Sequence, residues 1–219
     1  MMETKETPGK TKIAVSTPIQ VGGNVITPEQ LTVIASAAGP EAHIEITPFR
    51  QIYVEIAAEE KEKVTEQLQQ AGLQVYPAGA VVKGLIACQF CKGAEDAGLA
   101  TAQAIHQAIA GMAAPVPIKV AYAGCALGTS EPLLKDIGVV KMKDTFSIYV
   151  GGEPKGIKTA IAEPLAEGLK EEQVIPAIMK VIDFYKSNAK GKEKFAKFVR
   201  RMTLEKIREA AGVAVSPNA

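Results

Sequence analysis

The stretch that decides the fold is Gly84-Leu-Ile-Ala-Cys88-Gln-Phe-Cys91-Lys-Gly-Ala-Glu-Asp96, which holds two of the three cysteines. The third cysteine, Cys125, lies in a second loop further along the chain. An apolar run precedes each loop, at residues 80–87 and 118–122, and both runs predict β-strands. The Ala-rich segment 92–112 predicts a helix directly after the first loop. A fold built from these elements can bring thiols that are distant in sequence close together.

The chain before these loops predicts a small unit of mixed strands and helices. Thr27-Pro-Glu-Gln30 is a compact helix start, with Thr27 as N-cap, a proline in the first turn and Gln30 where a capping box needs it. The other patterns predict a polar, disordered tail at 1–11, strands at 12–17, 44–46 and 52–56, and a second helix at 59–71.

The chain after the second loop predicts one more strand and then helices. Residues 145–150 alternate as a strand that ends at Gly151-Gly152. Apolar residues then recur at helical spacing in three segments, 171–186, 195–201 and 203–211, before a short tail at 212–219. Strands and helices that are partly segregated in this way predict the α+β fold class.

Length, composition and charge narrow the function classes. A chain of 219 residues can bury a core without disulfide staples, and its net charge of +1 provides no field that would recruit nucleic acid. The first ten residues lack the apolar core of a signal peptide, and no apolar run reaches membrane-spanning length. We therefore expect a cytoplasmic protein with reduced thiols and with no nucleic-acid or membrane partner.

The spacing of the cysteines leaves four chemistries open. A zinc site would need four ligands from the three cysteines and the two histidines, His43 and His106. Cys88 and Cys91 at a helix start could form a dithiol redox pair. The three thiolates could instead supply three of the usual four ligands of an iron–sulfur cluster. They could also be ordinary buried cysteines.

The residues around the thiols resemble the nitrite and sulfite reductases that carry siroheme and a [4Fe-4S] cluster. In those proteins a cysteine pair precedes a Lys/Gly/Ala-rich segment, and a strand-Gly-Cys loop precedes an Asp-Ile-Gly element. The matching residues here are Cys88 and Cys91, Gly124-Cys125, Asp136-Ile-Gly138, the strand end Gly151-Gly152, Thr47-Pro-Phe-Arg50-Gln51, and Asp183-Phe-Tyr with residues 193–201. The resemblance covers roughly residues 12–211.

The resemblance implies a fold in two parts. Residues 12–76 would form a ferredoxin-like half-domain, and residues 77–211 would form the α/β cluster-binding domain of the family together with the C-terminal helices. Larger members of the family contain two such modules, whereas this chain has one. It would therefore match a small single-module type, or a half that completes its site as a homodimer.

The resemblance also implies a reaction: a small oxyanion, sulfite or nitrite, is reduced at siroheme, which receives electrons from the cluster and ultimately from an electron-donor protein. Arg50, Lys83 and Lys119 match the catalytic positions that surround the anion in the family, where charge-assisted hydrogen bonds neutralise it.

The resemblance assigns the cofactor ligands as well. The cluster ligands would be Cys88, Cys91 and Cys125, and the cofactor-binding positions would be those of Arg50, Lys92 and Thr129.

Two positions depart from the pattern of the family. The first pair is spaced C-x2-C instead of C-x5-C, and Thr129 stands where the family has its last cysteine, which ligates the cluster and bridges it to siroheme. A neutral hydroxyl is a poor ligand for iron in a soft sulfide cluster. The sequence therefore also supports an alternative: a non-catalytic paralogue or partner subunit that binds a tetrapyrrole or a cluster without reducing the oxyanion.

Overall fold

The structure is a computed structural model that describes residues 9–157 and 159–213. The chain divides into two compact units. The first, here called the N-terminal unit, comprises residues 1–18 and 24–78, and the second, here called the cysteine unit, comprises residues 19–23 and 79–219. Most of the two predicted tails, 1–11 and 212–219, lies outside the described residues. The first strand begins at Lys10, so the predicted N-terminal tail is too long.

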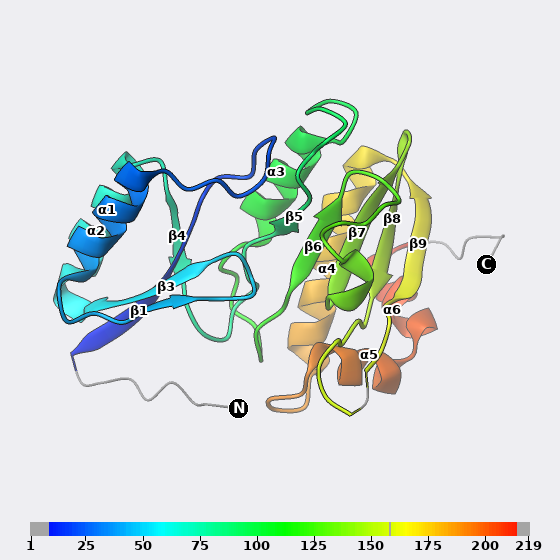
Figure 1. Cartoon of the computed structure of the whole chain (residues 1–219). Coiled ribbons are helices and arrows are strands. Elements are labelled where there is room, and N and C mark those ends of the chain that lie inside the picture. Colours follow the sequence, from blue (N-terminus) through cyan, green and yellow to red (C-terminus); the bar gives the residue numbers. More distant parts are fainter. Residues whose placement is uncertain (1–8, 158, 214–219) are drawn as a thin grey trace. The chain divides into compact units, whose positions relative to one another are not determined.

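The N-terminal unit has the β-α-β-β-α-β order of a ferredoxin-like fold. Its elements are β1 (Lys10–Ser16), α1 (Pro28–Ala38), β2 (Ile44–Ile46), β3 (Ile52–Ala57), a short 3₁₀ turn (Ala58–Glu60), α2 (Lys61–Gln70) and β4 (Gln74–Pro77). The strands form an antiparallel sheet in the order β2-β3-β1-β4 (Figure 1). Strand β4 was not predicted from the sequence, because four residues that end in proline carry little strand signal.

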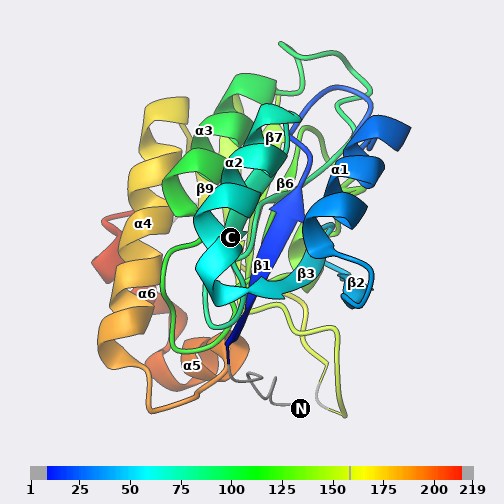
Figure 2. The same cartoon turned by 90° about the vertical axis from the view of Figure 1, so that its left-hand side faces the viewer.

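Helices α1 and α2 lie side by side on one face of this sheet (Figures 1 and 2). The predicted capping box of α1 is confirmed, since the Thr27 hydroxyl accepts from the Gln30 amide at 3.1 Å and the Gln30 side chain accepts from the Thr27 amide at 3.0 Å. The helices and the sheet bury one apolar core, which contains Ile13, Val15, Ile34, Val54, Ile56, Val64, Leu68 and Leu73.

The cysteine unit contains a mixed five-stranded sheet in the order β5-β6-β7-β8-β9. Strands β5, β6 and β7 are parallel, and β8 and β9 continue the sheet in antiparallel fashion. The elements are β5 (Ile86–Ala87), α3 (Leu99–Ile109), β6 (Val120–Ala123), a 3₁₀ turn (Pro132–Leu134), β7 (Ile137–Met142), β8 (Thr145–Val150), β9 (Glu163–Leu169), α4 (Glu171–Asn188), α5 (Phe195–Met202) and α6 (Leu204–Ala211). The α+β fold class and the C-terminal helices are thus confirmed.

Three expectations for this unit need correction. The predicted strand 80–87 is regular only at Ile86–Ala87, with isolated bridges at Val81 and Val82. The helix predicted from residue 92 begins at Leu99, because Gly93 and Gly98 adopt positive φ angles of 92° and 68° that interrupt a helix. Third, only helices were predicted after residue 152, but residues 163–169 form strand β9.

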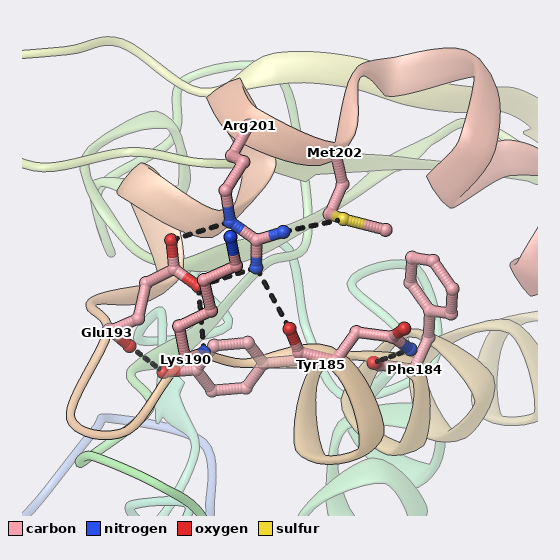
Figure 3. A network of polar contacts seen from close by, with 7 residues as sticks. Phe184, Tyr185, Lys190, Glu193, Arg201 and Met202 are labelled. Atoms are coloured by element: carbon pink, nitrogen blue, oxygen red, sulfur yellow. Dashed lines mark hydrogen bonds and ion pairs between the residues drawn. The ribbon is translucent and has the colours of Figure 1, made fainter.

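Helix α4 packs along the sheet of the cysteine unit and carries one row of its core (Figure 1). Val174, Ile178, Val181 and Tyr185 are fully buried, as their helical spacing predicts. After α4 the chain turns through residues 189–194, and Glu193 of this turn forms an ion pair with Arg201 of α5 (Figure 3). No helix in the described part of the chain is both long and apolar enough to span a bilayer.

Candidate functional site

Cys88 and Cys125 lie at the ends of two neighbouring parallel strands. Cys88 follows β5 directly, and its amide donates to the Tyr122 carbonyl at 3.0 Å, which continues the pairing with β6. Cys125 lies just after β6, and the amide of the residue before it, Gly124, donates to Cys88 Sγ at 3.2 Å. The fold therefore joins the two cysteine loops. A backbone N–H on sulfur favours a thiolate and is a common feature of cysteines that bind iron–sulfur clusters.

Gly124 is the residue that permits this approach. A Cβ atom at this position would lie 2.6 Å from both Cβ and the carbonyl oxygen of Ala97, in the turn before α3. Such distances are far below van der Waals contact, so only glycine lets the two loops pack together. The Gly-Cys pair thus has a steric reason that is independent of any cofactor.

A Gly124→Ala variant should lose about 2 kcal/mol of unfolding free energy or more, because the new methyl group displaces Ala97. Urea unfolding followed by circular dichroism measures this loss. The control is Ala126→Ser, because Ala126 lies on the exposed turn after Cys125 and this substitution meets no steric obstacle. Equal stability of the glycine variant and the parent would contradict the packing argument.

Cys91 and Thr129 are placed differently from Cys88. Cys91 is exposed in a turn that follows Phe90, a buried residue with φ of 54°, and Thr129 is exposed in the loop after Cys125. All three cysteines are free thiols. Within residues 9–157 and 159–213, no three His, Cys, Asp or Glu side chains lie close enough together to hold a metal ion.

An open pocket of about 480 Å³ lies beside Cys125. Three chain segments line it: the turn after Cys91, with Lys92 and Asp96; the loop of Gly124, Cys125 and Ala126; and the β7–β8 hairpin tip, with Lys141, Met142, Lys143 and Asp144. Of the predicted cofactor-binding residues, Lys92 thus lies next to a cysteine, in a pocket with an excess of cationic side chains. The two lysines of the hairpin were not predicted, because their place follows only from the β7–β8 pairing.

Lys83 and Lys119, predicted to face the substrate anion, both have partners within the cysteine unit. The Lys83 side chain is buried, its Nζ donates to the Gly79 carbonyl at 2.9 Å, and burial lowers its pKa to about 8. Lys119 Nζ lies 3.5 Å from the Asp136 carboxylate. Their catalytic role stays a prediction, and it would require both ammonium groups to turn from these partners toward an anion.

Asp136 explains the Asp-Ile-Gly element structurally. Its carboxylate is buried and accepts from the Lys119 backbone amide at 2.8 Å, which ties the start of β7 to β6. Gly138 is needed because a Cβ would lie 2.4 Å from the Pro132 carbonyl oxygen. Burial raises the pKa of Asp136 to about 6, although the Lys119 ammonium lowers it in part.

Asp136→Asn should therefore change the pH profile of stability. A carboxyl group whose pKa is raised on folding favours the folded state most when it is protonated, so the parent should lose stability as the pH rises from about 4 to about 6. We expect on the order of 2 kcal/mol for this loss, and the asparagine variant should lack it. Denaturant unfolding at pH 4, 5, 6 and 7 measures the difference, and parallel profiles for the two proteins would contradict it.

His106 positions the segment that leads to Cys88. Its Nδ1 accepts from the Leu85 amide at 3.1 Å from within α3, and burial lowers the pKa of the imidazole to about 4. A neutral, buried histidine with this contact is a structural residue. The sequence could not separate this role from a ligand role, because both require the same residue type.

Arg50 belongs to the N-terminal unit and lies in the tight connection between β2 and β3. The Thr47 hydroxyl donates to the Gln51 carbonyl at 2.7 Å, and Arg50 is exposed with φ of 57°. A left-handed arginine is unusual and costs about 1 kcal/mol, which marks this connection as constrained. The Thr-Pro-Phe-Arg-Gln sequence is therefore a turn that presents Arg50.

Among the described residues of the same unit, four polar side-chain atoms are buried without a hydrogen-bond partner. They are Ser16 Oγ, Thr17 Oγ1, Gln51 Oε1 and Gln74 Oε1. Ser16 pairs with Gln74 across the sheet, and Gln51 immediately precedes the strand that pairs with β1 on its other side. They thus gather at one end of three neighbouring strands. Buried polar atoms normally have partners, so this row is suited to hydrogen-bond an additional polar group.

Comparison with known proteins agrees with this architecture. Residues 79–217 match the family described as the nitrite and sulphite reductase 4Fe-4S domain. The chain belongs to this family. It is similar to the assimilatory-type sulfite reductase of Nitratidesulfovibrio vulgaris, with 32% identity over 58% of this chain and 56% of the relative. It is also similar to the cobalt-factor III methyltransferase of Priestia megaterium, with 28% identity over 80% of this chain and 32% of the relative.

Solved structures share the fold at low identity. A crystal structure of dissimilatory sulfite reductase I superposes with a TM-score of 0.73 at 12% identity and covers 95% of this chain and 70% of that one. The Mycobacterium tuberculosis NirA protein has a TM-score of 0.66 at 12% identity, over 91% of this chain and 39% of that one. The chain spans about a third and about half the length of the two curated relatives above.

The residues present fit the cofactors of the family in part. Cys88 and Cys125 have the soft donor atoms, and Cys88 the N–H···S contact, that suit a [4Fe-4S] cluster, but Cys91 would have to move toward them. In the row at Ser16, Thr17, Gln51 and Gln74, only the two hydroxyl groups can donate to a siroheme carboxylate, because the unpartnered atoms of Gln51 and Gln74 are carbonyl oxygens, which accept.

Proposed function

We propose that this chain is an iron–sulfur redox module of the nitrite and sulfite reductase family, in which Cys88, Cys91 and Cys125 hold the cluster. The observation that carries the proposal is the meeting of Cys88 and Cys125 at the ends of β5 and β6, with the Gly124 amide on Cys88 Sγ. When bound, the cluster supplies one-electron transfer. The chain contributes soft sulfur ligands and a backbone N–H that donates to the Cys88 sulfur.

The protein surroundings support electron transfer more directly than substrate chemistry. The buried Lys83 ammonium donates to the Gly79 carbonyl, and the Lys119 ammonium is paired with Asp136. Neither ammonium is therefore presented to an anion in this arrangement. The relative from Priestia megaterium is named for a methyl transfer on cobalt-factor III and not for sulfite reduction. This chain matches 32% of that relative, so the reaction in the relative's name is no evidence for the reaction of this chain. The function is argued from the site, because one fold can serve several functions.

A second candidate is the reduction of sulfite or nitrite at a siroheme, with electrons from a donor protein. The observation that favours it is the constrained turn that presents the exposed Arg50, since a guanidinium suits a carboxylate or an oxyanion. The sulfite reductase of Nitratidesulfovibrio vulgaris, at 32% identity, supports it as well. In that reaction Arg50 would neutralise the oxyanion. Lys83 and Lys119 would donate protons to the oxygens that leave as water only after leaving the Gly79 carbonyl and the Asp136 carboxylate.

Anaerobic purification followed by iron, sulfide and tetrapyrrole analysis separates the two candidates. The cluster module predicts iron and acid-labile sulfide with no tetrapyrrole, because the cluster consists of iron and sulfide held by cysteine thiolates. The reductase predicts stoichiometric tetrapyrrole in addition. Protein that contains neither group and fails to take up either one on reconstitution would reject both candidates.

A further inference from the structure

The β7–β8 hairpin is fastened to the turn after Cys91 through one side chain. Lys141 Nζ donates to the Asp96 carbonyl at 2.9 Å and to the Lys143 carbonyl at 2.7 Å. Its aliphatic stem passes over Gly98, where an added Cβ would lie 3.0 Å from Lys141 Cδ. Two of the three segments that line the pocket beside Cys125, the hairpin and the turn after Cys91, are therefore held together by contacts that do not involve a ligand.

The tip of the hairpin is conformationally strained. Met142 pairs with Thr145, which leaves Lys143 and Asp144 as a two-residue turn, and Lys143 has φ of 57°. Glycine or asparagine is the residue that normally occupies a left-handed position in such a turn. A lysine at this left-handed position makes the folded chain less stable than a glycine would, and the Lys143 side chain lines the pocket. Strain at a site that lines a cavity is a reason to look for a function there.

The lining divides the pocket into an apolar part and a cationic part. Cys125, Ala126 and Met142 provide the apolar surface, and Met142 is 45% exposed. Three lysines, at 92, 141 and 143, outnumber the two aspartates at 96 and 144. A volume of about 480 Å³ is within the range of small-molecule sites, which begins at roughly 300 Å³.

We propose that this pocket binds a small organic anion with at least two negatively charged groups, carboxylate or phosphate, held by Lys92 and Lys143. Lys141 acts as the fixed support of the site because its protons are engaged by two carbonyl oxygens. The inference does not rest on the presence of a cluster, since the pocket and its charges belong to the protein alone. A bound anion would lie beside Cys125 and fill the open pocket next to the loop of residues 124–126.

Isothermal titration calorimetry of the full chain tests the proposal, with citrate as the carboxylate probe and inorganic pyrophosphate as the phosphate probe. At a fixed ionic strength of about 0.15 M, one of the probes should bind with saturation at one site per chain. Lys92→Gln and Lys143→Gln should each weaken binding about tenfold, which is the usual effect of losing one charge-assisted hydrogen bond. Which probe binds more tightly identifies the anionic group.

Two further variants test whether the charge of the pocket lining controls the affinity for the anion. Asp144→Asn should strengthen binding severalfold, because it removes a negative charge from the lining. Lys206→Gln, on the exposed face of α6 in the same unit, should leave the affinity unchanged. Absence of saturable binding for both probes, or equal weakening by Lys206→Gln, would overturn the proposal.

Lys143→Gly separates a binding role from a structural one. Glycine relaxes the left-handed turn, so the unfolding midpoint should rise by a few degrees, while anion binding should weaken as in Lys143→Gln. A higher midpoint with unchanged anion affinity would show that Lys143 has no part in binding and would overturn its assignment.

Discussion

An Arg201→Ala variant should unfold about 10 °C below the parent chain, because it leaves a buried carboxylate without its cationic partner. Arg201 Nε and Nη2 donate to the two Glu193 oxygens at 2.9 and 2.7 Å (Figure 3). Nη2 also donates to the Asn188 carbonyl at 2.9 Å. Only 3% of the Glu193 side chain is exposed.

This pair holds the turn that connects α4 to α5. The Tyr185 hydroxyl donates to the Glu193 carbonyl from the last turns of α4, and the ring of Tyr185 contacts the rings of Phe195 and Phe198 edge to face. A misplaced turn would therefore disturb the aromatic core of the unit. Glu193→Ala should be milder than Arg201→Ala, because the guanidinium left behind can reach water.

The pH dependence provides an internal control for this prediction. The Arg201 guanidinium lowers the pKa of Glu193 to about 2, so its contribution to stability is complete above the ordinary pKa of 4.5 and is lost as the pH falls toward 2. The deficit of Arg201→Ala should thus be largest near neutral pH and shrink below about 4. Arg200→Ala, at the exposed neighbouring position, is the matched control, and an equal midpoint for the two variants would contradict the account.

The second large effect concerns the cysteine loops. Cys125→Ala and Cys88→Ala should each reduce the iron retained after anaerobic reconstitution about tenfold, because two thiolates do not hold a cluster securely. Both variants should keep the circular dichroism spectrum of the parent, which distinguishes loss of ligand from loss of fold. Iron retention equal to that of the parent in both variants would contradict the assignment of these ligands.

Position 129 allows a cysteine to be added, whereas the variants above remove one. Thr129→Cys adds a thiolate at the position of the family's last cysteine, and it should slow loss of iron to a chelator about tenfold. Thr129→Ser is the matched control, since it retains a hydroxyl in the same exposed loop. Equal rates of iron loss for the two variants would mean that the loop does not reach the cluster.

The N-terminal unit was the easier part to predict, because local signals agree with the fold there. The capping box of α1 and the alternation in β3 depend on neighbours in the sequence, and both are found as expected. Strand β9 depends instead on pairing with β8 through an irregular register, and its Glu-Pro-Leu-Ala-Glu-Gly-Leu sequence shows no alternation. Its formation is a tertiary effect that propensity cannot reveal.

The candidate site also has features that local sequence predicts and features that depend on the folded chain. The two cysteine loops could be predicted to meet because each follows an apolar strand, and the pairing of β5 with β6 joins them. The fates of Lys83 and Lys119 could not be predicted, because burial against Gly79 and pairing with Asp136 depend on backbone groups that only the folded chain brings near. The lysines of the hairpin tip were missed for the same reason.

The most direct test of the central claim is the iron and acid-labile sulfide content of the chain after anaerobic reconstitution and desalting. We expect three to four of each per chain, roughly the content of one cluster held by three thiolates, and a paramagnetic signal of the reduced cluster that Cys125→Ala abolishes. Iron below about one tenth per chain, in protein whose three thiols titrate as free, would contradict it.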